Sequence, residues 1–176
     1  DQEIVNDVRT NGFNVILTSN KHKTGTDRIH EALIKSNIKD VDLIMNLQGD
    51  EPAIDIDDIK SLNEKMVKNH SNLGTLASKI KDNKNLKNEN IVKVITENML
   101  SENNFPRGIS FLRKSELTDN IYHHIGVYCY SKGSLEKFVQ LSQSKNEIEN
   151  RLEQLRALDN NIDINVSLAK SSPIGV

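Results

Sequence analysis

The stretch that decides the expected fold is Leu43-Ile44-Met45-Asn46-Leu47-Gln48-Gly49-Asp50-Glu51-Pro52. Its first part is an apolar run without alternation, which is typical of a strand buried on both faces inside a parallel sheet. The run stops at Gly49, where backbone can pass close to another group, and Pro52 prevents further ladder pairing. In open α/β sheets the ligand crevice lies beyond the carboxyl ends of the strands, so we expect a ligand at this end.

Two adjacent carboxylates, Asp50 and Glu51, follow this strand. Magnesium prefers one or two carboxylates together with phosphate oxygens, so the pair indicates a divalent metal and a phosphate-bearing substrate. The alternative is a charged loop that only closes the strand. These residues alone leave both interpretations open.

Size and composition indicate an ordinary single domain. The 176 residues are 36% hydrophobic and 27% charged, enough for a proper core. The net charge of -2 provides no broad field for nucleic acid or an anionic membrane. Cys129 is the only cysteine, so we expect a reducing, cytoplasmic compartment. No apolar stretch is long enough to span a bilayer, and nothing resembles a signal peptide.

Hydrophobic periodicity predicts alternating helices and strands up to residue 80, a rhythm that implies a parallel, layered sheet. After residue 80 the pattern changes, and residues 98–112 look irregular. The predicted helices are 2–11, one beginning with Thr26 as N-cap, 55–69, 132–141 and 147–158. The predicted strands are 13–17, the central run from Leu43, 73–80, 91–96, 121–130 and 163–169.

Two further segments, residues 24–28 and the predicted strand 121–130, have side chains suited to binding a ligand. Thr24-Gly25-Thr26-Asp27-Arg28 opens a helix whose free N–H groups could bind an anion, although simple capping with a solvated or Asp27-paired Arg28 also fits. In the strand 121–130, alternation places His124 and Tyr128 on the same face around Gly126. A ligand contact and a structural role for His124 both remain open.

Residues 151–158 form a third segment of interest. Ile148, Leu152 and Leu155 make an apolar stripe, and Glu153 and Gln154 point elsewhere. Arg156 follows Glu153 by three residues, and a Glu and an Arg at this spacing on a helix normally form a surface ion pair.

Four motifs in this order resemble the 3-deoxy-manno-octulosonate cytidylyltransferase (CMP-Kdo synthetase) family, and the match covers nearly the whole chain. They are His22-Lys23-Thr24-Gly25-Thr26-Asp27-Arg28, Asn46-Leu47-Gln48-Gly49-Asp50-Glu51-Pro52, His124-Ile125-Gly126-Val127-Tyr128 and Leu152-Glu153-Gln154-Leu155-Arg156. The resemblance implies a Rossmann-like, three-layer mixed α/β sheet of the nucleotide-diphospho-sugar transferase type, with a smaller sugar-binding and dimerisation lobe at 97–131 inside a single domain 1–176. It also implies a cytoplasmic homodimer that uses CTP and Kdo to make CMP-Kdo and pyrophosphate for lipopolysaccharide biosynthesis, with Mg²⁺ as cofactor.

The resemblance also assigns residue roles. Asp50 looks like the metal-binding and catalytic aspartate, and Arg107 like a catalytic arginine, although Pro106 stands where the family has serine. The expected sugar contacts are Gln48, His124, Tyr128, Glu153 and Gln154. The expected nucleotide contacts are Thr24, Gly25, Thr26 and Arg28.

The chain departs from the family pattern at both ends. It lacks the family's opening loop with Gly-Lys-Pro, and it stops at Gly175-Val176, before the second metal-binding aspartate of Gly-Val-Asp-Thr-Pro. We therefore expect a fragment that is inactive as it stands.

Attack of the sugar hydroxyl on the α-phosphorus requires alignment and charge neutralisation more than covalent help. In the expected mechanism Arg107 and His124 attract the sugar carboxylate. One alternative is a cytidylyltransferase for 8-amino-Kdo or another acidic sugar. An alternative of another class is a non-catalytic binding or dimerisation module. A nucleic-acid-binding role is disfavoured, since no basic stripe or aromatic platform is present.

Overall fold

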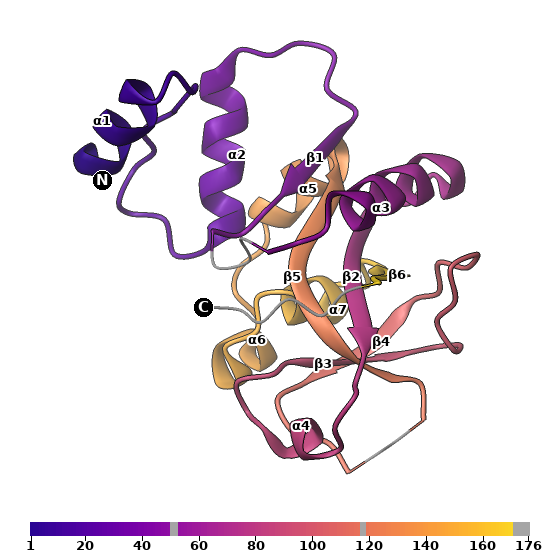
Figure 1. Cartoon of the computed structure of the whole chain (residues 1–176). Helices are drawn as coiled ribbons and strands as arrows, with labels where there is room; N and C mark the ends of the chain where they lie inside the picture. Colours follow the sequence, from indigo (N-terminus) through magenta and orange to yellow (C-terminus); the bar gives the residue numbers. More distant parts are fainter. Residues whose placement is uncertain (50–52, 117–118, 171–176) are drawn as a thin grey trace. The chain divides into compact units, whose positions relative to one another are not determined.

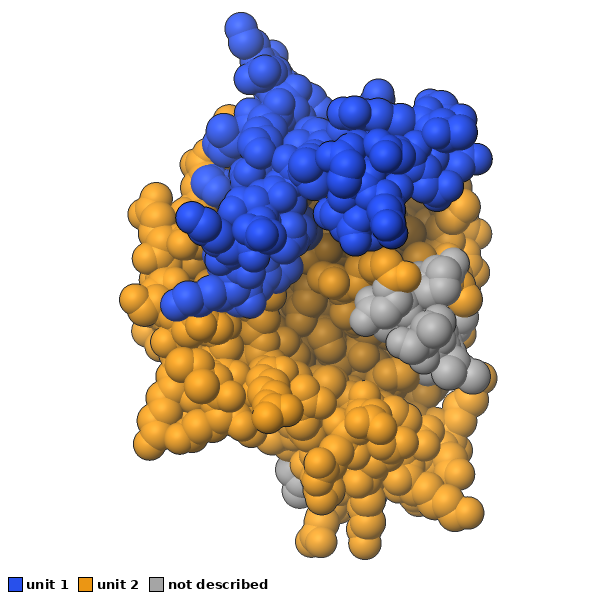
Figure 2. All heavy atoms as spheres, turned by 90° about the vertical axis from the view of Figure 1, so that its left-hand side faces the viewer, with its two compact units in different colours: residues 1–42 blue, residues 43–176 orange. Residues whose placement is uncertain are grey.

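The computed structural model describes residues 1–49, 53–116 and 119–170. Its internal contacts divide the chain into two compact units, residues 1–42 and 43–176, which are coloured separately in Figure 2 and described separately below. The predicted single domain 1–176 and the predicted lobe 97–131 stay predictions.

The first unit contains the helices α1 (Gln2–Thr10) and α2 (Gly25–Ser36), close to their predicted positions. The N-cap of α2 is Thr24 rather than the expected Thr26, because Thr24 has the extended backbone of an N-cap and its hydroxyl accepts from the Asp27 N–H at 3.4 Å. Thr26 lies inside the first turn and is buried. Asn37, with φ of 53°, ends the helix in the left-handed conformation.

The strand predicted at 13–17 does not form. Phe13 and Leu17 are 70% and 46% exposed, and none of the described residues pairs with this segment in a ladder. A strand needs a partner for its backbone groups, so apolar sequence alone does not produce one. One backbone contact here comes from Lys35, whose Nζ donates to the Leu17 carbonyl at 3.0 Å.

The second unit is built on a six-stranded mixed sheet in the order β4-β3-β5-β2-β6, with β1 also paired to β5 (Figure 1). The long strand β5 runs antiparallel to β1, β2 and β3, whereas β2 and β6 are parallel. The strands are β1 (Leu43–Asn46), β2 (Leu73–Lys79), β3 (Lys93–Thr96), β4 (Gly108–Leu112), β5 (Ile121–Ser131) and β6 (Asn165–Leu168).

The expected environment of β1 is wrong. It is a four-residue strand whose first three side chains are only half-buried, and it pairs antiparallel with β5. Both β1 and β2 run antiparallel to β5, so they share a direction, as the β-α-β rhythm predicted, but β5 lies between them. Local periodicity cannot reveal the insertion of β5, because the paired residues are far apart in the sequence, as in Leu43 with Ser131 and Asn46 with Tyr128.

The helices α3 (Ile56–Asn69) and α5 (Lys132–Val139) form where the periodicity predicted them. The helix predicted at 147–158 is instead two short helices, α6 (Lys145–Asn150) and α7 (Leu155–Asp159). Arg151, with φ of 53°, separates them, since a helix interior excludes positive φ. The region predicted as irregular contains β4, and the polar connection before β3 contains the short helix α4 (Lys84–Lys87).

The helices cover both faces of the sheet, so the predicted three-layer mixed α/β architecture is confirmed (Figure 1). On one face Leu62 and Met66 of α3 pack into the core cluster with Leu76 of β2 and Ile125 of β5. On the other face the ring of Phe138 in α5 packs against the ring of Tyr130, with the two ring centroids 6.0 Å apart. Within the described ranges, no helix has the length and apolar character needed to cross a membrane.

Candidate functional site

A bulge in β5 shapes the middle of the sheet. Thr75 of β2 pairs with Tyr128, whereas the next residue, Leu76, pairs with Ile125, so Gly126 and Val127 have no ladder partner in β2. The Thr75 hydroxyl donates to the Val127 carbonyl at 2.7 Å and so satisfies part of this irregular backbone. The bulge inserts an even number of residues, two. The side chains of β5 on either side of it therefore keep the same alternation between the two faces of the sheet.

The structure brings His124 and Tyr128 together on the face that carries α5. Their ring centroids are 5.5 Å apart, and the row continues to Tyr130 at 6.2 Å from Tyr128. At its other end Phe111 meets His124 edge-on at 5.1 Å. The aromatic row fixes both polar side chains by packing.

Gln48 joins this group from the chain that follows β1. A Cβ added to Gly126 would lie 3.8 Å from Gln48 Cγ, so the Gln48 side chain lies beside the space that a side chain at position 126 would fill. The Gln48 amide donates to Asn46 Oδ1 at 3.2 Å, and Asn46, which is buried, pairs in register with Tyr128. Asn46 was not among the predicted site residues; its signal was a polar side chain inside an apolar run.

Glu153 and Gln154 lie between α6 and α7. Gln154 is buried, and Glu153 Oε1 is a buried oxygen that has no hydrogen-bond partner among the described residues. Burial, then Tyr130, then Glu153 raise the pKa of Tyr128 well above its ordinary value, so the Glu153 carboxylate acts on Tyr128 electrostatically. A buried acceptor without a donor is costly, and a hydroxyl-bearing ligand would relieve that cost. We name Asn46, Gln48, His124, Tyr128 and Glu153 the polar cluster.

The environment of His124 bears on the predicted attraction between this residue and the sugar carboxylate, which stays a prediction. Burial, followed by the nearby His123, lowers the pKa of His124 to about 3. At neutral pH the ring is therefore uncharged, and it can exchange hydrogen bonds with a ligand but cannot attract a carboxylate as a cation.

Arg107 forms ion pairs with two carboxylates outside the polar cluster. Its guanidinium contacts Glu97 at 3.2 Å and Asp163 at 3.3 Å, and these carboxylates raise its pKa, Glu97 most. All three side chains are well exposed, Arg107 at 51%, Glu97 at 46% and Asp163 at 66%. The contacts of Arg107 in the described part of the chain do not join it to the polar cluster, so its catalytic role stays a prediction.

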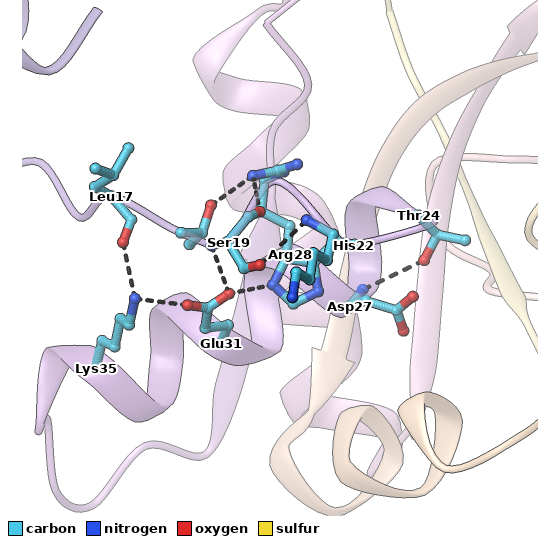
Figure 3. Close-up of polar contacts among 10 residues, drawn as sticks. Leu17, Ser19, His22, Thr24, Asp27, Arg28, Glu31 and Lys35 are labelled. Atoms are coloured by element: carbon cyan, nitrogen blue, oxygen red, sulfur yellow. Dashed lines mark hydrogen bonds and ion pairs between the residues drawn. The ribbon is translucent and has the colours of Figure 1, made fainter. Parts of the chain in front are cut away.

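The predicted nucleotide segment lies in the first unit, at the start of α2 (Figure 3). Arg28 donates to Thr18 Oγ1 at 2.6 Å and to the Ser19 carbonyl at 3.0 Å, and so braces the loop before the helix. Thr24, Gly25 and Thr26 form the cap and first turn of the helix.

Glu31 is a second brace on the same loop, and it was missed at the level of sequence. It accepts from the Ser19 N–H at 2.9 Å, pairs with Lys35 at 2.6 Å, and contacts His22 (Figure 3). The Lys35 contact, followed by His22 and Ser19, lowers the pKa of Glu31 to about 2. Its sequence signal was its place one turn after Arg28 on the same helix.

Asp50, the predicted metal ligand, and Glu51 lie outside the described residues. Among residues 1–49, 53–116 and 119–170, no group of three His, Cys, Asp or Glu side chains could hold a metal ion. The predicted magnesium site therefore depends on carboxylates outside those ranges, whose chemistry suits the ion.

The fold is that of the nucleotidyltransferases of the nucleotide-sugar transferase type. The solved structure of CMP:2-keto-3-deoxy-manno-octonic acid synthetase complexed with CTP is 28% identical, with a TM-score of 0.86, over 100% of this chain and 72% of that one. The 4-diphosphocytidyl-2C-methyl-D-erythritol synthase of Anaerococcus prevotii, 16% identical with a TM-score of 0.59 over 100% of this chain and 71% of that one, shares the fold alone.

The chain belongs to the cytidylyltransferase family, whose model matches residues 1–164. The 3-deoxy-manno-octulosonate cytidylyltransferase of Agrobacterium fabrum is 36% identical over 100% of this chain and 70% of its own length. That of Brucella ovis is also 36% identical, over 99% of this chain and 70% of its own length. The predicted family and its nucleotidyltransferase class are confirmed.

Proposed function

We propose that this protein transfers the cytidylyl group of CTP to Kdo, giving CMP-Kdo and pyrophosphate for lipopolysaccharide synthesis. The observation that carries the proposal is the convergence of Gln48, His124, Tyr128 and Glu153 beside the bulge of β5. A row of rigid rings with a buried, unsatisfied carboxylate oxygen suits a ligand with many hydroxyls. The identities to the two bacterial relatives support the same substrates.

In the proposed reaction the polar cluster binds and orients the sugar. Glu153 accepts a hydrogen bond from a sugar hydroxyl, while the Gln48 amide and the Tyr128 hydroxyl exchange hydrogen bonds with its other oxygens. Fixing the anomeric hydroxyl in line with the α-phosphorus contributes to the rate enhancement, because phosphoryl transfer depends on positioning together with charge neutralisation. The loop braced by Arg28 and Glu31 is proposed to contact the nucleotide.

We also propose magnesium as the cofactor, held by Asp50. When bound, the ion neutralises phosphate charge and lowers the pKa of the attacking hydroxyl. The support is chemical: carboxylate is the donor that magnesium prefers, and Gln48, two positions earlier in the sequence, belongs to the polar cluster.

The test is an assay of the intact protein with CTP, magnesium and either Kdo or 8-amino-Kdo. We expect pyrophosphate release with Kdo, and loss of turnover without loss of folding in Asp50→Asn. Unchanged turnover in Asp50→Asn would refute the metal role, and a preference for 8-amino-Kdo would reassign the sugar. No release with either sugar would overturn the proposed activity.

We further propose a cytoplasmic homodimer, as the family resemblance implies. The segment expected to form the dimer contact includes two exposed apolar side chains, Met99 at 72% and Ile109 at 56%. Analytical ultracentrifugation of the intact protein tests the homodimer. We expect Met99→Lys and Ile109→Lys to shift the monomer–dimer equilibrium toward the monomer. A monomer in the unsubstituted protein would contradict it.

A further inference from the structure

A buried hydroxyl of β2 connects the ring of His124 to the bulge. Thr75 Oγ1 lies 3.0 Å from His124 Nε2, and Thr75 is fully buried. The same oxygen lies 2.7 Å from the Val127 carbonyl and 3.3 Å from the Ile125 carbonyl. Three potential hydrogen-bond partners thus surround one hydroxyl.

Counting protons decides the direction of each bond. A threonine hydroxyl has one proton to donate, and a carbonyl oxygen can only accept. The 2.7 Å contact between Thr75 and Val127 therefore requires the Thr75 proton. Thr75 Oγ1 is left with lone pairs alone toward His124, so the Nε2 atom of His124 must be the donor.

The tautomer of His124 follows. A neutral imidazole has one protonated nitrogen, so Nε2–H leaves Nδ1 with a lone pair. Burial of the ring keeps the second proton off at neutral pH, since its pKa is lowered to about 3. In this tautomer the free acceptor of His124 is Nδ1, and Glu153 Oε1, for which the described residues provide no donor, is a second acceptor.

We propose that Thr75 is a positioning residue, which holds His124 in the Nε2–H tautomer so that Nδ1 accepts a hydrogen bond from a hydroxyl of the bound sugar. The inference deepens the proposed function and rests on it for the identity of the ligand. Two acceptors in one cluster match a polyhydroxy ligand and would repel a carboxylate, so the sugar carboxylate is bound by groups other than His124.

The first experiment needs no substrate. In the intact protein, ¹⁵N–¹H spectra of the imidazoles distinguish the two neutral tautomers and the imidazolium. We expect the Nε2–H tautomer for His124 in the unsubstituted protein and in Thr75→Ser, which keeps the hydroxyl. In Thr75→Val, which keeps the shape, we expect a shift toward Nδ1–H. The inference is overturned by Nδ1–H or imidazolium in the unsubstituted protein, or by an unchanged tautomer in Thr75→Val.

The second experiment measures KM for each substrate. Thr75→Val should raise KM for Kdo about tenfold, which corresponds to ~1.4 kcal/mol, and leave KM for CTP unchanged, while Thr75→Ser restores the original values. An unchanged KM for Kdo, or equal changes for both substrates, would overturn the positioning role. Thr75→Ala replaces Thr75→Val if the latter does not fold. An unsubstituted protein with the Nε2–H tautomer but no activity on Kdo would overturn the proposed function and leave the tautomer assignment standing.

Discussion

Arg156 of α7 donates two hydrogen bonds to the carboxylate of Glu147 in α6, at 2.6 and 2.8 Å. Both side chains are buried, with 2% and 4% exposed, and the Arg156 guanidinium also lies 4.6 Å from the centre of the Phe138 ring. The pair spans the turn that carries Glu153 and Gln154, so it holds this turn from both sides. Glu147 in addition caps the helix by accepting from the Ser144 N–H.

Glu147→Gln should lower the free energy of unfolding by about 3 to 5 kcal/mol, because it removes the carboxylate charge from a buried ion pair that is joined by two hydrogen bonds. The matched control is Glu149→Gln in the same helix, whose pair with Lys145 is 3.7 Å long and mostly exposed. The control should change the free energy by less than about 0.5 kcal/mol. Urea unfolding measures both, and similar values for the two variants would contradict the prediction.

The same pair predicts how stability depends on pH. Burial alone would raise the pKa of Glu147, but hydrogen bonds from Arg156 and Gln143 lower it overall below its ordinary value of 4.5. The folded state therefore binds this proton less readily than the unfolded state does, and the stabilisation is present above pH 4.5 and declines as the pH falls through the folded-state pKa. The difference in unfolding free energy between the unsubstituted protein and Glu147→Gln should shrink on acidification. A difference that is constant down to about pH 3 would argue against this linkage.

Lys93 of β3 joins two backbone segments, the stretch just before β3 and the stretch just after β4. Its ammonium donates to the carbonyls of Asn88 and Ile91 at 2.7 Å and of Arg113 at 2.6 Å, and the residue is fully buried. Lys93→Met keeps the stem and removes the donors, which should cost about 3 kcal/mol or more of unfolding free energy. Lys114→Met is the control, since that side chain is 62% exposed. Equal melting temperatures for the two variants would show that the three bonds contribute little.

Hydrophobic periodicity correctly predicted those features of the fold that are determined by residues close together in the sequence. The spacing of Leu62 and Met66 predicted α3, and the period of two in β5 placed His124 and Tyr128 on one face. The apolar stripe Ile148, Leu152 and Leu155 suggested one continuous helix, but Arg151 interrupts it. In a continuous helix, residues nine apart such as Glu147 and Arg156 lie on different faces and cannot pair. That pair, the partner of β1 and the Thr75 contact are all set by tertiary structure, which no local pattern encodes.

Gly126 tests the polar cluster without disturbing the fold. A methyl group there would meet Gln48 Cγ at 3.8 Å, an ordinary contact, so Gly126→Ala should change the unfolding free energy by about 1 kcal/mol or less. The same methyl occupies space beside the sugar contacts, so KM for Kdo should rise several-fold while KM for CTP stays constant. Gly133→Ala is the control, since among the described residues, apart from its chain neighbours and the backbone of its own helix, no atom lies within 4 Å of its added Cβ. An unchanged KM for Kdo in Gly126→Ala would place the sugar elsewhere.

Glu31 provides the corresponding test of the nucleotide segment. Its carboxylate holds the loop before α2 through Ser19, His22 and Lys35, and Glu31→Gln weakens these contacts by removing the charge while keeping the shape. KM for CTP should rise several-fold with KM for Kdo unchanged, because the loop that precedes Thr24 loses its anchor. Glu3→Gln, in the exposed first turn of α1, is the control and should leave both constants unchanged. A rise in KM for Kdo alone would move residues 18–28 from the nucleotide to the sugar, and no change in either constant would remove this loop from the binding site.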